Sequence, residues 1–401
     1  MSWLWRRSAR CAPGRARPRL LLVHPSAQLY GSDRMLLQSV RALAADWDLH
    51  VVLAEDGPLV VACRAAGAQV EVLPFPVLRK GILHPAGIVR LAGRVVAGLA
   101  SGRWLARVRR ADAVYVNTLT VPLWLLLARL AGVPAVCHVH EAEESLPAVL
   151  RRSLALPLRL ACLVVANSQA ARAVLVRSDP RLEGRIRVLH NGVPGPTRAP
   201  TPLRDRVTGD LRLLLVGRLS WRKGTDVAVE ALDRLTRRGL AARLTLAGDA
   251  FAGYEPFVRG LRERVGALGL AGRVHFTGFV PDVWRLHEEA DVVLVPSRCE
   301  PFGNVAVEAM LAGRPVVAAA AQGLPEIVRD GVTGLLVPAG DAEALAAAVE
   351  RLAEDWSLAG RLAADGRRWA GDRFAVERYA QRLRDLVAVL VAPDDDLLGV
   401  G

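Results

Sequence analysis

The sequence predicts an α/β protein built from two halves, each a parallel sheet with helices on its faces. Short apolar runs alternate with longer helical segments along the whole chain, which is the pattern of repeated strand–helix–strand units. With 401 residues the chain is also too long for one ordinary hydrophobic core. We therefore expect two domains of similar architecture.

A first series of strands and helices fills the first half of the chain. Its expected strands are the short apolar runs Leu20–Val23, Leu49–Leu53, Gln69–Leu73, Ala113–Val116, Ala135–His138 and Cys162–Ala166. Its expected helices include Asp33–Ala45, Ile88–Leu99, Val121–Leu130 and Gln169–Arg177. The segment Gly192–Pro202 follows, and its density of proline and glycine favours a linker.

A second series follows the linker. Its expected strands are Leu211–Val216, Arg243–Leu246, Val274–Phe276, Val292–Val295, Pro315–Ala318 and Gly334–Val337. Its expected helices lie near Asp226–Arg238, Pro256–Leu268, Asn304–Ala312, Ala342–Leu352 and Ser357–Ala370. The last segment, Asp372–Val391, is long and amphipathic and is typical of a closing helix.

These series predict the domain limits. We expect a basic tail over 1–17, an N-terminal domain over 18–195, a C-terminal domain over 196–371, a closing helix over 372–391 and a tail over 392–401. Two Rossmann-like domains facing a cleft are the economical architecture for such a chain. The closing helix is expected to cross back to the N-terminal domain.

The composition bears on partners and location. The net charge is +13, but of the 53 basic residues only Lys80 and Lys223 are lysines, an arginine bias typical of a GC-rich genome. Zinc-finger spacing, RNA-binding aromatic motifs and basic zipper helices are all missing from the sequence, so we expect no specific nucleic-acid partner. The 5 cysteines are scattered without paired spacing, which favours a reduced cytoplasm.

The N-terminus has two interpretations. Six arginines precede residue 20 and no acidic residue precedes Asp33, yet the segment lacks the apolar run of a signal peptide. The long apolar stretches Val121–Cys137 and Leu154–Val165 are interrupted by arginine and proline, so no spanning helix is expected. The basic tail is either a frayed end or a segment attracted to anionic lipid head groups, which would place the protein peripherally on the inner face of a membrane.

Two strand-to-helix junctions carry the functional prediction. Val216–Asp226 leaves an apolar run through a glycine-bounded loop that holds Arg218 and Lys223. Glu300–Met310 leaves another apolar run and enters a helix whose free amides favour an anion, with Glu300 before the helix and Glu308 inside it. Together they describe a pocket for a sugar joined to a diphosphate, because cations and amides bind phosphates and carboxylates accept from hydroxyls. Taken alone, the first stretch also fits a solvated basic turn and the second an ordinary surface helix.

Several ordered motifs resemble the family 4 retaining glycosyltransferases. The dense part of the resemblance runs from about residue 211 to 340, through Gly217-Arg218, Lys223-Gly224, Leu246–Asp249, Phe276–Gly278, Pro296-Ser297, Glu300–Gly303, Glu308-Ala309 and Gly323–Glu326. A looser part includes Tyr30–Asp33, Asn117-Thr118, His138–Glu141, Asn167-Ser168 and His190–Gly192. The resemblance implies the two-domain GT-B fold, transfer with retention, and no metal or other cofactor, the nucleotide-diphosphate sugar being a substrate.

The resemblance also implies site residues. Arg218 and Lys223 would hold the donor diphosphate, Glu300 the transferred sugar, and Glu308 the ribose, while His140 would contact the donor sugar. The remaining donor-binding positions would act through their backbones or by close approach: Gly31, Gly217, Gly278, Phe279, Phe302, Gly303 and Asn304. His138 points to the same face of its strand as His140, and the choice of His140 depends on the following Glu141.

The expected function is transfer of a sugar to an acceptor hydroxyl in cell-envelope or polysaccharide synthesis, with a glycan or lipid-linked acceptor. A metal site is not expected, since the acidic run Asp394–Asp396 lies in the terminal tail, where solvation explains it. Two alternatives stay open: a nucleotide-sugar epimerase of the same fold, for which no acid/base set is found, and a non-catalytic nucleotide-sugar-binding protein.

Overall fold

The structure is a computed structural model that describes residues 16–391 except 79–92, 94, 97, 99–101, 143, 145, 251 and 252. Its internal contacts divide the chain into two compact units, Met1–Gly192 with Val376–Gly401 and Val193–Ala375. The sequence placed the boundary between the two domains slightly later, between residues 195 and 196. The expected tails over 1–15 and 392–401, and most of the expected helix Ile88–Leu99, lie outside the described residues.

Within the described residues, the first unit is a seven-stranded parallel sheet in the order β3-β2-β1-β4-β5-β6-β7. Its strands are β1 (Arg19–His24), β2 (Asp48–Leu53), β3 (Gln69–Val72), β4 (Ala113–Val116), β5 (Ala135–Val139), β6 (Leu163–Ala166) and β7 (Ile186–Val188). Its helices are α1 (Gly31–Leu43), α2 (Pro58–Ala65), α4 (Arg103–Val108), α5 (Leu123–Ala131), α6 (Ala148–Ala155), η2 (Leu156–Leu160), α7 (Gln169–Ser178), η3 (Pro180–Arg185) and α15 (Val376–Ala388).

The described part of the second unit contains a six-stranded parallel sheet in the order β10-β9-β8-β11-β12-β13. Its strands are β8 (Leu211–Val216), β9 (Ala242–Ala247), β10 (Val274–Gly278), β11 (Val292–Val295), β12 (Val316–Ala319) and β13 (Leu335–Val337). Its helices are η4 (Trp221–Lys223), α8 (Thr225–Arg237), α9 (Glu255–Ala267), α10 (Trp284–Glu289), α11 (Asn304–Leu311), α12 (Leu324–Ile327), α13 (Ala342–Glu354) and α14 (Trp356–Arg373).

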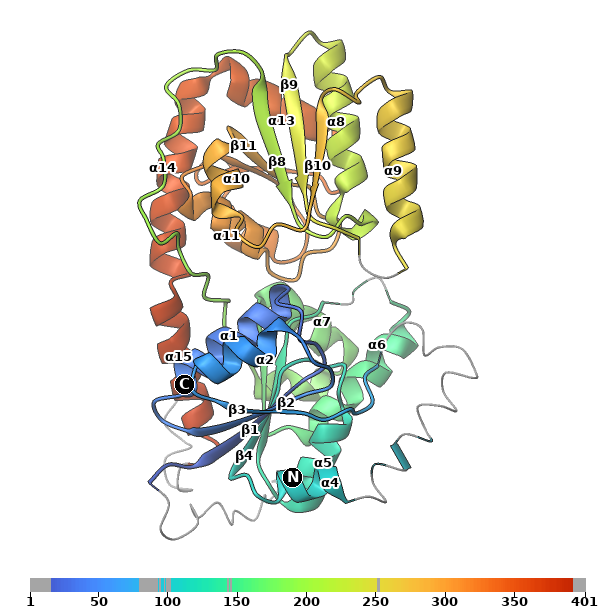
Figure 1. Cartoon of the computed structure of the whole chain (residues 1–401), viewed down its shortest axis with the longest axis vertical. Coiled ribbons are helices and arrows are strands. Elements are labelled where there is room, and N and C mark those ends of the chain that lie inside the picture. Colours follow the sequence, from blue (N-terminus) through green and yellow to red (C-terminus); the bar gives the residue numbers. More distant parts are fainter. Residues whose placement is uncertain are drawn as a thin grey trace. The chain divides into compact units, whose positions relative to one another are not determined.

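Helices cover both faces of each sheet (Figure 1). The strand residues show why: Leu21 and Val23 of β1 belong to one buried cluster, while Leu20 and Leu22 belong to the cluster on the other face. A strand buried on both faces must be apolar at every position, which is why the strands appear in the sequence as continuous apolar runs. The predicted α/β fold with two Rossmann-like domains is confirmed.

The closing helix α15 returns to the first unit, as predicted. Leu383 and Val387 of α15 are fully buried in the same cluster as Val40 of α1. The Tyr379 hydroxyl lies 2.7 Å from the Ser39 hydroxyl, and the Arg384 side chain donates to the carbonyl of Ala42 at 2.9 Å. Apolar burial and these two polar contacts therefore bind the end of the chain to its beginning.

The helix predicted from Asp372 begins later in the structure. Helix α14 continues to Arg373, the helical conformation is interrupted at Phe374, and α15 starts at Val376. The buried ring of Phe374 meets Phe302 edge-on at 5.6 Å between centroids, and its carbonyl accepts from the amide of Val193 at 2.9 Å. These tertiary contacts end the helix, and nothing local in the sequence predicts them.

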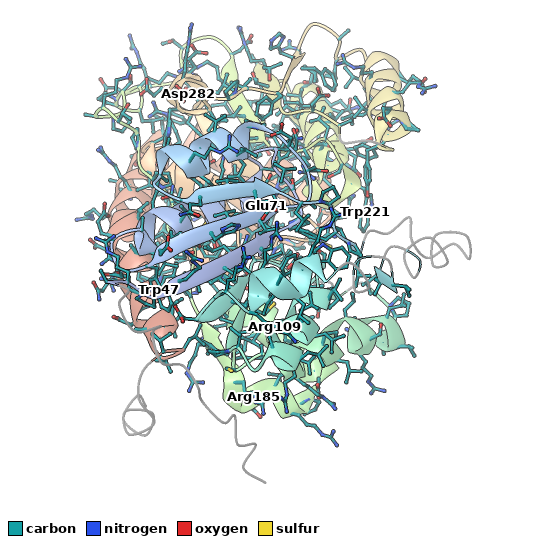
Figure 2. All side chains as sticks on the ribbon, turned by 60° about the horizontal axis from the view of Figure 1, so that its bottom comes forward. Trp47, Glu71, Arg109, Arg185, Trp221 and Asp282 are labelled. Carbon is teal, nitrogen blue, oxygen red and sulfur yellow. The ribbon has the colours of Figure 1, made fainter. Side chains whose placement is uncertain are left out.

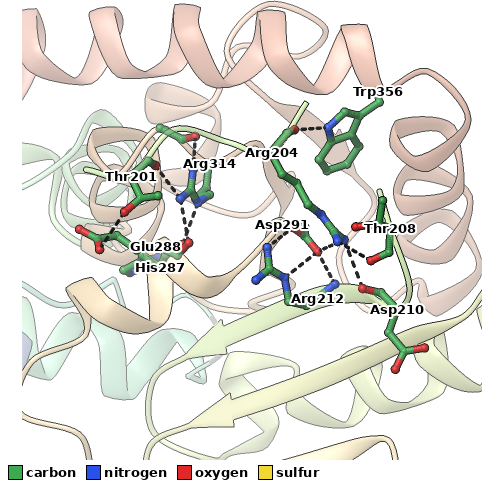
Figure 3. A network of polar contacts seen from close by, with 11 residues as sticks. Thr201, Arg204, Thr208, Asp210, Arg212, His287, Glu288, Asp291, Arg314 and Trp356 are labelled. Carbon is green, nitrogen blue, oxygen red and sulfur yellow. Dashed lines mark hydrogen bonds and ion pairs between the residues drawn. The ribbon is translucent and has the colours of Figure 1, made fainter. Parts of the chain in front are cut away.

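The segment after Gly192 is held against the second unit (Figure 3). Arg204 donates to buried Asp291 at 2.5 Å, and Asp291 also accepts from Arg212 at 2.8 Å. The indole of Trp356 donates to the carbonyl of Arg204 at 2.7 Å, and buried Arg314 donates to the carbonyl of Thr201 at 2.8 Å. The predicted linker therefore leads into a segment that packs on the C-terminal sheet.

Candidate functional site

In the second unit, glycines lie where adjacent strands end. Gly217 follows β8 with a φ of 142°, Gly248 follows β9 with a φ of 151°, and Gly278 ends β10 with a φ of 71°. A side-chain carbon on Gly248 would lie 1.9 Å from the carbonyl oxygen of Gly217. Only glycine fits there, so the strand ends approach closely and leave their backbone along the carboxyl edge of the sheet.

The basic loop after β8 is held in place by the loop after β11. Gly224 has a φ of 66°, and a side-chain carbon there would lie 2.1 Å from the carbonyl oxygen of Pro296. The Arg298 guanidinium donates to both carboxylate oxygens of Asp226 at 2.8 Å and lies 4.8 Å from the ring centroid of Trp221, which is labelled in Figure 2. The bidentate pair and the stacked ring fix the conformation of the loop that carries Lys223.

Lys223 and Glu300 are in direct contact in this structure. The Lys223 ammonium forms an ion pair with the Glu300 carboxylate, which also accepts from the Ser297 hydroxyl at 3.2 Å. The two side chains are 26% and 12% exposed, so a ligand can reach them although they are mostly covered. A side-chain carbon on Gly217 would lie 3.5 Å from Cε of Lys223, which places the lysine stem beside this glycine.

The junction before α11 presents backbone to this part of the sheet edge. Gly303 has a φ of 123°, and a side-chain carbon there would lie 2.7 Å from the side chain of Leu324. The side chain of Phe302 is buried against Phe374, so only its backbone is available to a ligand. Asn304 begins the helix, so its amide is the first of α11, and the amides of Gly303 and Phe302 directly precede it.

Glu308, inside α11, has a neutral neighbour. Its carboxylate lies 4.0 Å from Nε2 of His287, a residue of α10 that is wholly buried. Burial, with a smaller contribution from the nearby Arg314 charge, lowers the pKa of His287 to about 3. His287 is therefore uncharged at neutral pH, and it packs against Glu308 without neutralising it. Phe279, after β10, is 46% exposed.

In the first unit, polar side chains follow three neighbouring strands at their carboxyl ends. His24 ends β1, Asn117 follows β4, and His140 follows β5. His140 Nε2 lies 2.9 Å from Oδ1 of Asn117, whose amide nitrogen lies 2.9 Å from Nδ1 of His24. The backbone amide of His140 donates to the Glu141 carboxylate at 3.0 Å, and that carboxylate also accepts from the Thr118 hydroxyl.

The His24 ring continues this set of contacts to Asp33, in the first turn of α1. Its Nε2 lies 2.6 Å from Asp33, which also accepts from the amides of Tyr30 at 3.0 Å and Gln28 at 3.2 Å. Burial alone would raise the pKa of Asp33, but the His24 contact and these hydrogen bonds outweigh it and hold the pKa below its usual value. Asp33 stays ionised and holds the loop around Gly31, where a side-chain carbon would meet nothing within 4 Å.

His138, in β5, and His140, directly after β5, differ in exposure. His138 is wholly buried and lies 2.5 Å from the Tyr115 hydroxyl through Nδ1, whereas His140 keeps some exposed surface. Burial lowers the pKa of His138 to about 3, and burial with the neighbouring His138 and His24 lowers the pKa of His140. Both rings are therefore neutral at neutral pH, and of the two only His140 has surface to offer a ligand.

The structure brings the predicted site residues together within each unit. Lys223 touches Glu300 directly, and Arg218, Gly217, Gly278 and the α11 junction belong to the same sheet edge; His140 and Gly31 belong to the first unit. Sequence reasoning gave no role to the polar residues that support them: His24, Asn117, Ser297, Arg298 and His287. For His24 and Asn117 a signal existed, because each stands at the carboxyl end of a predicted strand.

Among the described residues, no group of three or more histidines, cysteines or acidic residues is placed to hold a metal ion. The search of the same residues for a membrane-spanning segment finds no helix with the length and apolar character required.

Two Rossmann-like domains with a basic loop and an acidic helix junction at the second sheet edge define a GT-B glycosyltransferase class of protein. Residues 30–194 match the family model described as Glycosyltransferase Family 4, and residues 204–369 match the model described as Glycosyl transferases group 1. The chain belongs to the family 4 glycosyltransferases.

Named relatives agree with this membership. The chain is 32% identical to the GDP-mannose-dependent alpha-(1-6)-phosphatidylinositol monomannoside mannosyltransferase of Mycolicibacterium smegmatis, over 67% of this chain and 74% of that protein. It is 32% identical to the alpha-D-kanosaminyltransferase of Streptomyces kanamyceticus, over 59% of this chain and 66% of that protein. With the latter, the match therefore spans just under two thirds of the relative's length.

A solved structure supports the same architecture. The HepE protein of Anabaena, crystallised with UDP and glucose, superimposes with a TM-score of 0.78 at 26% identity, covering 93% of this chain and 100% of that chain. Both named relatives are transferases and the Anabaena structure contains UDP and glucose, so these comparisons lend no support to the epimerase or to the non-catalytic alternative.

Proposed function

We propose that this protein transfers a sugar from a nucleotide-diphosphate sugar to an acceptor hydroxyl with retention at the anomeric carbon. The observation that carries the proposal is the contact between Lys223 and Glu300, which brings a phosphate-binding cation and a hydroxyl-binding carboxylate to one glycine-lined sheet edge. In the reaction, the bond from C1 of the sugar to the diphosphate breaks and a bond from C1 to the acceptor oxygen forms. The leaving phosphate oxygen takes the acceptor proton.

Each residue of the second unit has a role in this proposal. Arg218 and Lys223 hold the diphosphate and stabilise the charge that grows on it as the bond to C1 breaks. Glu300 accepts from hydroxyls of the transferred sugar. Glu308 accepts from the ribose hydroxyls, and the neutral His287 beside it does not add a positive charge there.

Backbone groups complete the donor site. The amides of Phe302, Gly303 and Asn304 point their partial positive charge toward the sugar and phosphate, as the first amides of a helix do. Gly217 and the exposed Phe279, with Gly278, supply the surfaces for the diphosphate and the base. These donors and the two cations together provide the positive potential that we propose makes a divalent ion unnecessary.

We propose that residues of the first unit also contact the substrate. His140 is neutral and partly exposed, so its ring or backbone can hydrogen-bond to a sugar hydroxyl. Apart from its chain neighbours and its own helix, no atom of the described residues lies within 4 Å of where a side chain of Gly31 would begin, so their packing does not require a glycine there. We propose that this space is kept for the substrate.

The acceptor is proposed to be a glycan or a lipid-linked precursor of the cell envelope or of a polysaccharide. The name of the Mycolicibacterium relative, a transferase acting on a phosphatidylinositol mannoside, supports a lipid-linked class of acceptor. The same name includes GDP-mannose and the Anabaena structure contains UDP, so relatives with different bases support the general site rather than one base.

A donor screen tests the proposal. Thermal shift with a panel of nucleotide sugars should single out one donor, because a ligand at about 100 times its dissociation constant adds about 2.7 kcal/mol of stability. That donor is then incubated with acceptor analogues, and NMR of the anomeric proton reports whether the product keeps the donor's configuration. Binding without transfer to any acceptor would favour the non-catalytic alternative, and an isomerised donor the epimerase.

A further inference from the structure

A line of buried polar side chains connects the closing helix to His138 on β5 within the first unit. The Tyr379 hydroxyl of α15 lies 2.7 Å from the Ser39 hydroxyl of α1, which lies 3.3 Å from the Tyr115 hydroxyl of β4. Tyr115 lies 2.5 Å from Nδ1 of His138 on β5. All four side chains are at most 2% exposed. Tyr379 and Ser39 are 340 residues apart in sequence.

The donors and acceptors in this line can be assigned. Ser39 donates to the carbonyl of Met35 at 3.0 Å and shares this proton with the Tyr115 oxygen at 3.3 Å, so its own oxygen accepts from Tyr379. Burial raises the pKa of both Tyr115 and Tyr379, so both phenols keep their protons at neutral pH. A phenol is a better donor than a neutral imidazole, and an imidazole nitrogen is a better acceptor than a phenol oxygen. Tyr115 therefore donates to Nδ1 of His138, and the proton of His138 is on Nε2.

The tautomer of His140 follows from its contact with the side-chain amide of Asn117. The amide nitrogen of Asn117 is directed to His24 at 2.9 Å and to the carbonyl of Ser32 at 3.3 Å. Its amide oxygen therefore faces His140, and Nε2 of His140 must donate to it across 2.9 Å. The proton of His140 is thus on Nε2, and its Nδ1 carries a lone pair.

One donor and one acceptor remain, and they belong to adjoining rings. Among the described residues, Nε2 of His138 and Nδ1 of His140 are both buried and neither has a hydrogen-bond partner. The ring centroids are 4.1 Å apart, with a 41° angle between the planes. A small ring rotation would pair the Nε2 proton of His138 with the Nδ1 lone pair of His140, which would remove two buried unsatisfied groups at once.

We propose that His138 is a positioning residue for His140, and that it is held in the required tautomer by Tyr115, Ser39 and Tyr379 of the closing helix. His138 supports one face of the His140 ring and Asn117 fixes the opposite nitrogen, so the ring has one orientation toward the substrate. The closing helix thereby contributes to the site through Tyr379, although it holds no residue of the site. This inference rests on the proposed role of His140 in sugar transfer.

The test removes single hydroxyls from the line. Tyr115→Phe and Ser39→Ala should each lower kcat by about ten- to a hundredfold, since a misplaced group costs up to about 10² in rate, with the donor KM changed less than about twofold. Tyr379→Phe provides a second conservative variant if either of these folds poorly. Ser178→Ala is the matched control, because Ser178 is a buried helical serine that donates to the carbonyl of Val174 at 2.7 Å and lies outside the line.

A second measurement is independent of turnover. In protein labelled with ¹⁵N-histidine, the His138 signals, assigned by their loss in His138→Phe, should show an unprotonated Nδ1 and a protonated Nε2. The Tyr115→Phe variant should shift this pattern while Ser178→Ala leaves it unchanged. A protonated Nδ1 in the wild-type protein overturns the proposal.

The outcomes separate this inference from the proposed function. Wild-type kcat in both Tyr115→Phe and Ser39→Ala overturns the positioning role while leaving sugar transfer in place. Equal loss of kcat in Ser39→Ala and Ser178→Ala would assign the effect to general destabilisation and also overturn it. A wild-type protein that transfers no sugar from any donor defeats the proposed function, and the ¹⁵N spectra still decide the tautomer.

Discussion

Replacing Glu300 with glutamine should affect nucleotide binding and sugar transfer in opposite directions. The Glu300 carboxylate forms an ion pair with Lys223, the residue that we expect to bind the diphosphate. A diphosphate must therefore compete with Glu300 for the lysine. Glutamine keeps the shape of the side chain but has no charge, so Glu300→Gln frees the lysine while it removes the acceptor for the sugar hydroxyls.

The expected change in nucleotide diphosphate affinity follows from the solvent exposure of the Lys223–Glu300 ion pair. The Lys223 and Glu300 side chains are 26% and 12% exposed, which is more covered than an ordinary surface pair. Exposed pairs contribute about 0.2–1 kcal/mol, so we take about 1 kcal/mol for this one, equivalent to about fivefold in affinity. Nucleotide diphosphate should then bind Glu300→Gln as tightly as the wild type or up to about fivefold more tightly. Transfer should fall by about two to three orders of magnitude if Glu300 contacts the reacting sugar.

Isothermal titration with the nucleotide diphosphate of the preferred donor measures the first effect, and initial rates measure the second. Glu350→Gln is the matched control, because Glu350 pairs with Arg238 at 3.0 Å on α13 and should change neither quantity. Glu308→Gln should instead weaken both donor and nucleotide diphosphate binding. A Glu300→Gln protein that binds the diphosphate tenfold more weakly would refute the competition between carboxylate and phosphate.

Four further outcomes are expected. Arg218→Ala and Lys223→Ala should each lower turnover by about two to three orders of magnitude without unfolding, and near-wild-type rates in either would remove that residue from the diphosphate site. Transfer should persist in excess EDTA; complete loss that manganese or magnesium restores would contradict this. The free energy of unfolding, measured with urea, should fall as the pH drops below about 6.5. Burial lowers the pKa of His287 to about 3, so the unfolded chain binds this proton first and His287 contributes a loss of up to about 1.4 kcal/mol per pH unit. An equal pH dependence in His287→Asn would exclude His287 as its source. Each arginine near an anionic membrane surface contributes about 1 kcal/mol of attraction, so deleting residues 2–17 should abolish salt-sensitive binding to anionic vesicles and spare transfer to a soluble acceptor analogue. Vesicle binding that survives the deletion would locate the contact elsewhere.

Strands buried on both faces were the part of the fold that sequence predicted best. The expected strands Ala113–Val116, Leu211–Val216 and Val292–Val295 coincide with β4, β8 and β11. Such strands are apolar at almost every position, with Arg212 of β8 the exception among these three, so the sequence alone indicates which segments are buried. The short edge strand Ile186–Val188 has Arg187 at its centre, and without a continuous apolar run it gave no comparable signal.

Tertiary contacts decided what the sequence pattern did not. The sequence placed the end of one helix near Ala370 and the start of the next at Asp372, whereas α14 continues to Arg373, where the buried ring of Phe374 and its bond to Val193 end it. At the site, the sequence identified Lys223 and Glu300 as separate candidates, and their ion pair depends on two loops that meet because β8 and β11 are neighbours. Arg298 could not be distinguished by sequence from the many other arginines until its bidentate contact with Asp226 was located.

His138 and His140 also differ because of tertiary contacts that the local sequence does not predict, and here the contacts come from residues farther away in the chain. His138 and His140 are two positions apart and therefore point to the same side of the chain. In the local sequence only the neighbouring Glu141 distinguishes the one from the other. Their difference comes from Tyr115 on another strand and from Tyr379, which the chain brings to Ser39 only when its last helix returns to the first unit. Because a hydroxyl donor at the chain's end constrains a ring near its middle, substitutions in the closing helix should change the chemistry of the site without changing any residue that contacts substrate.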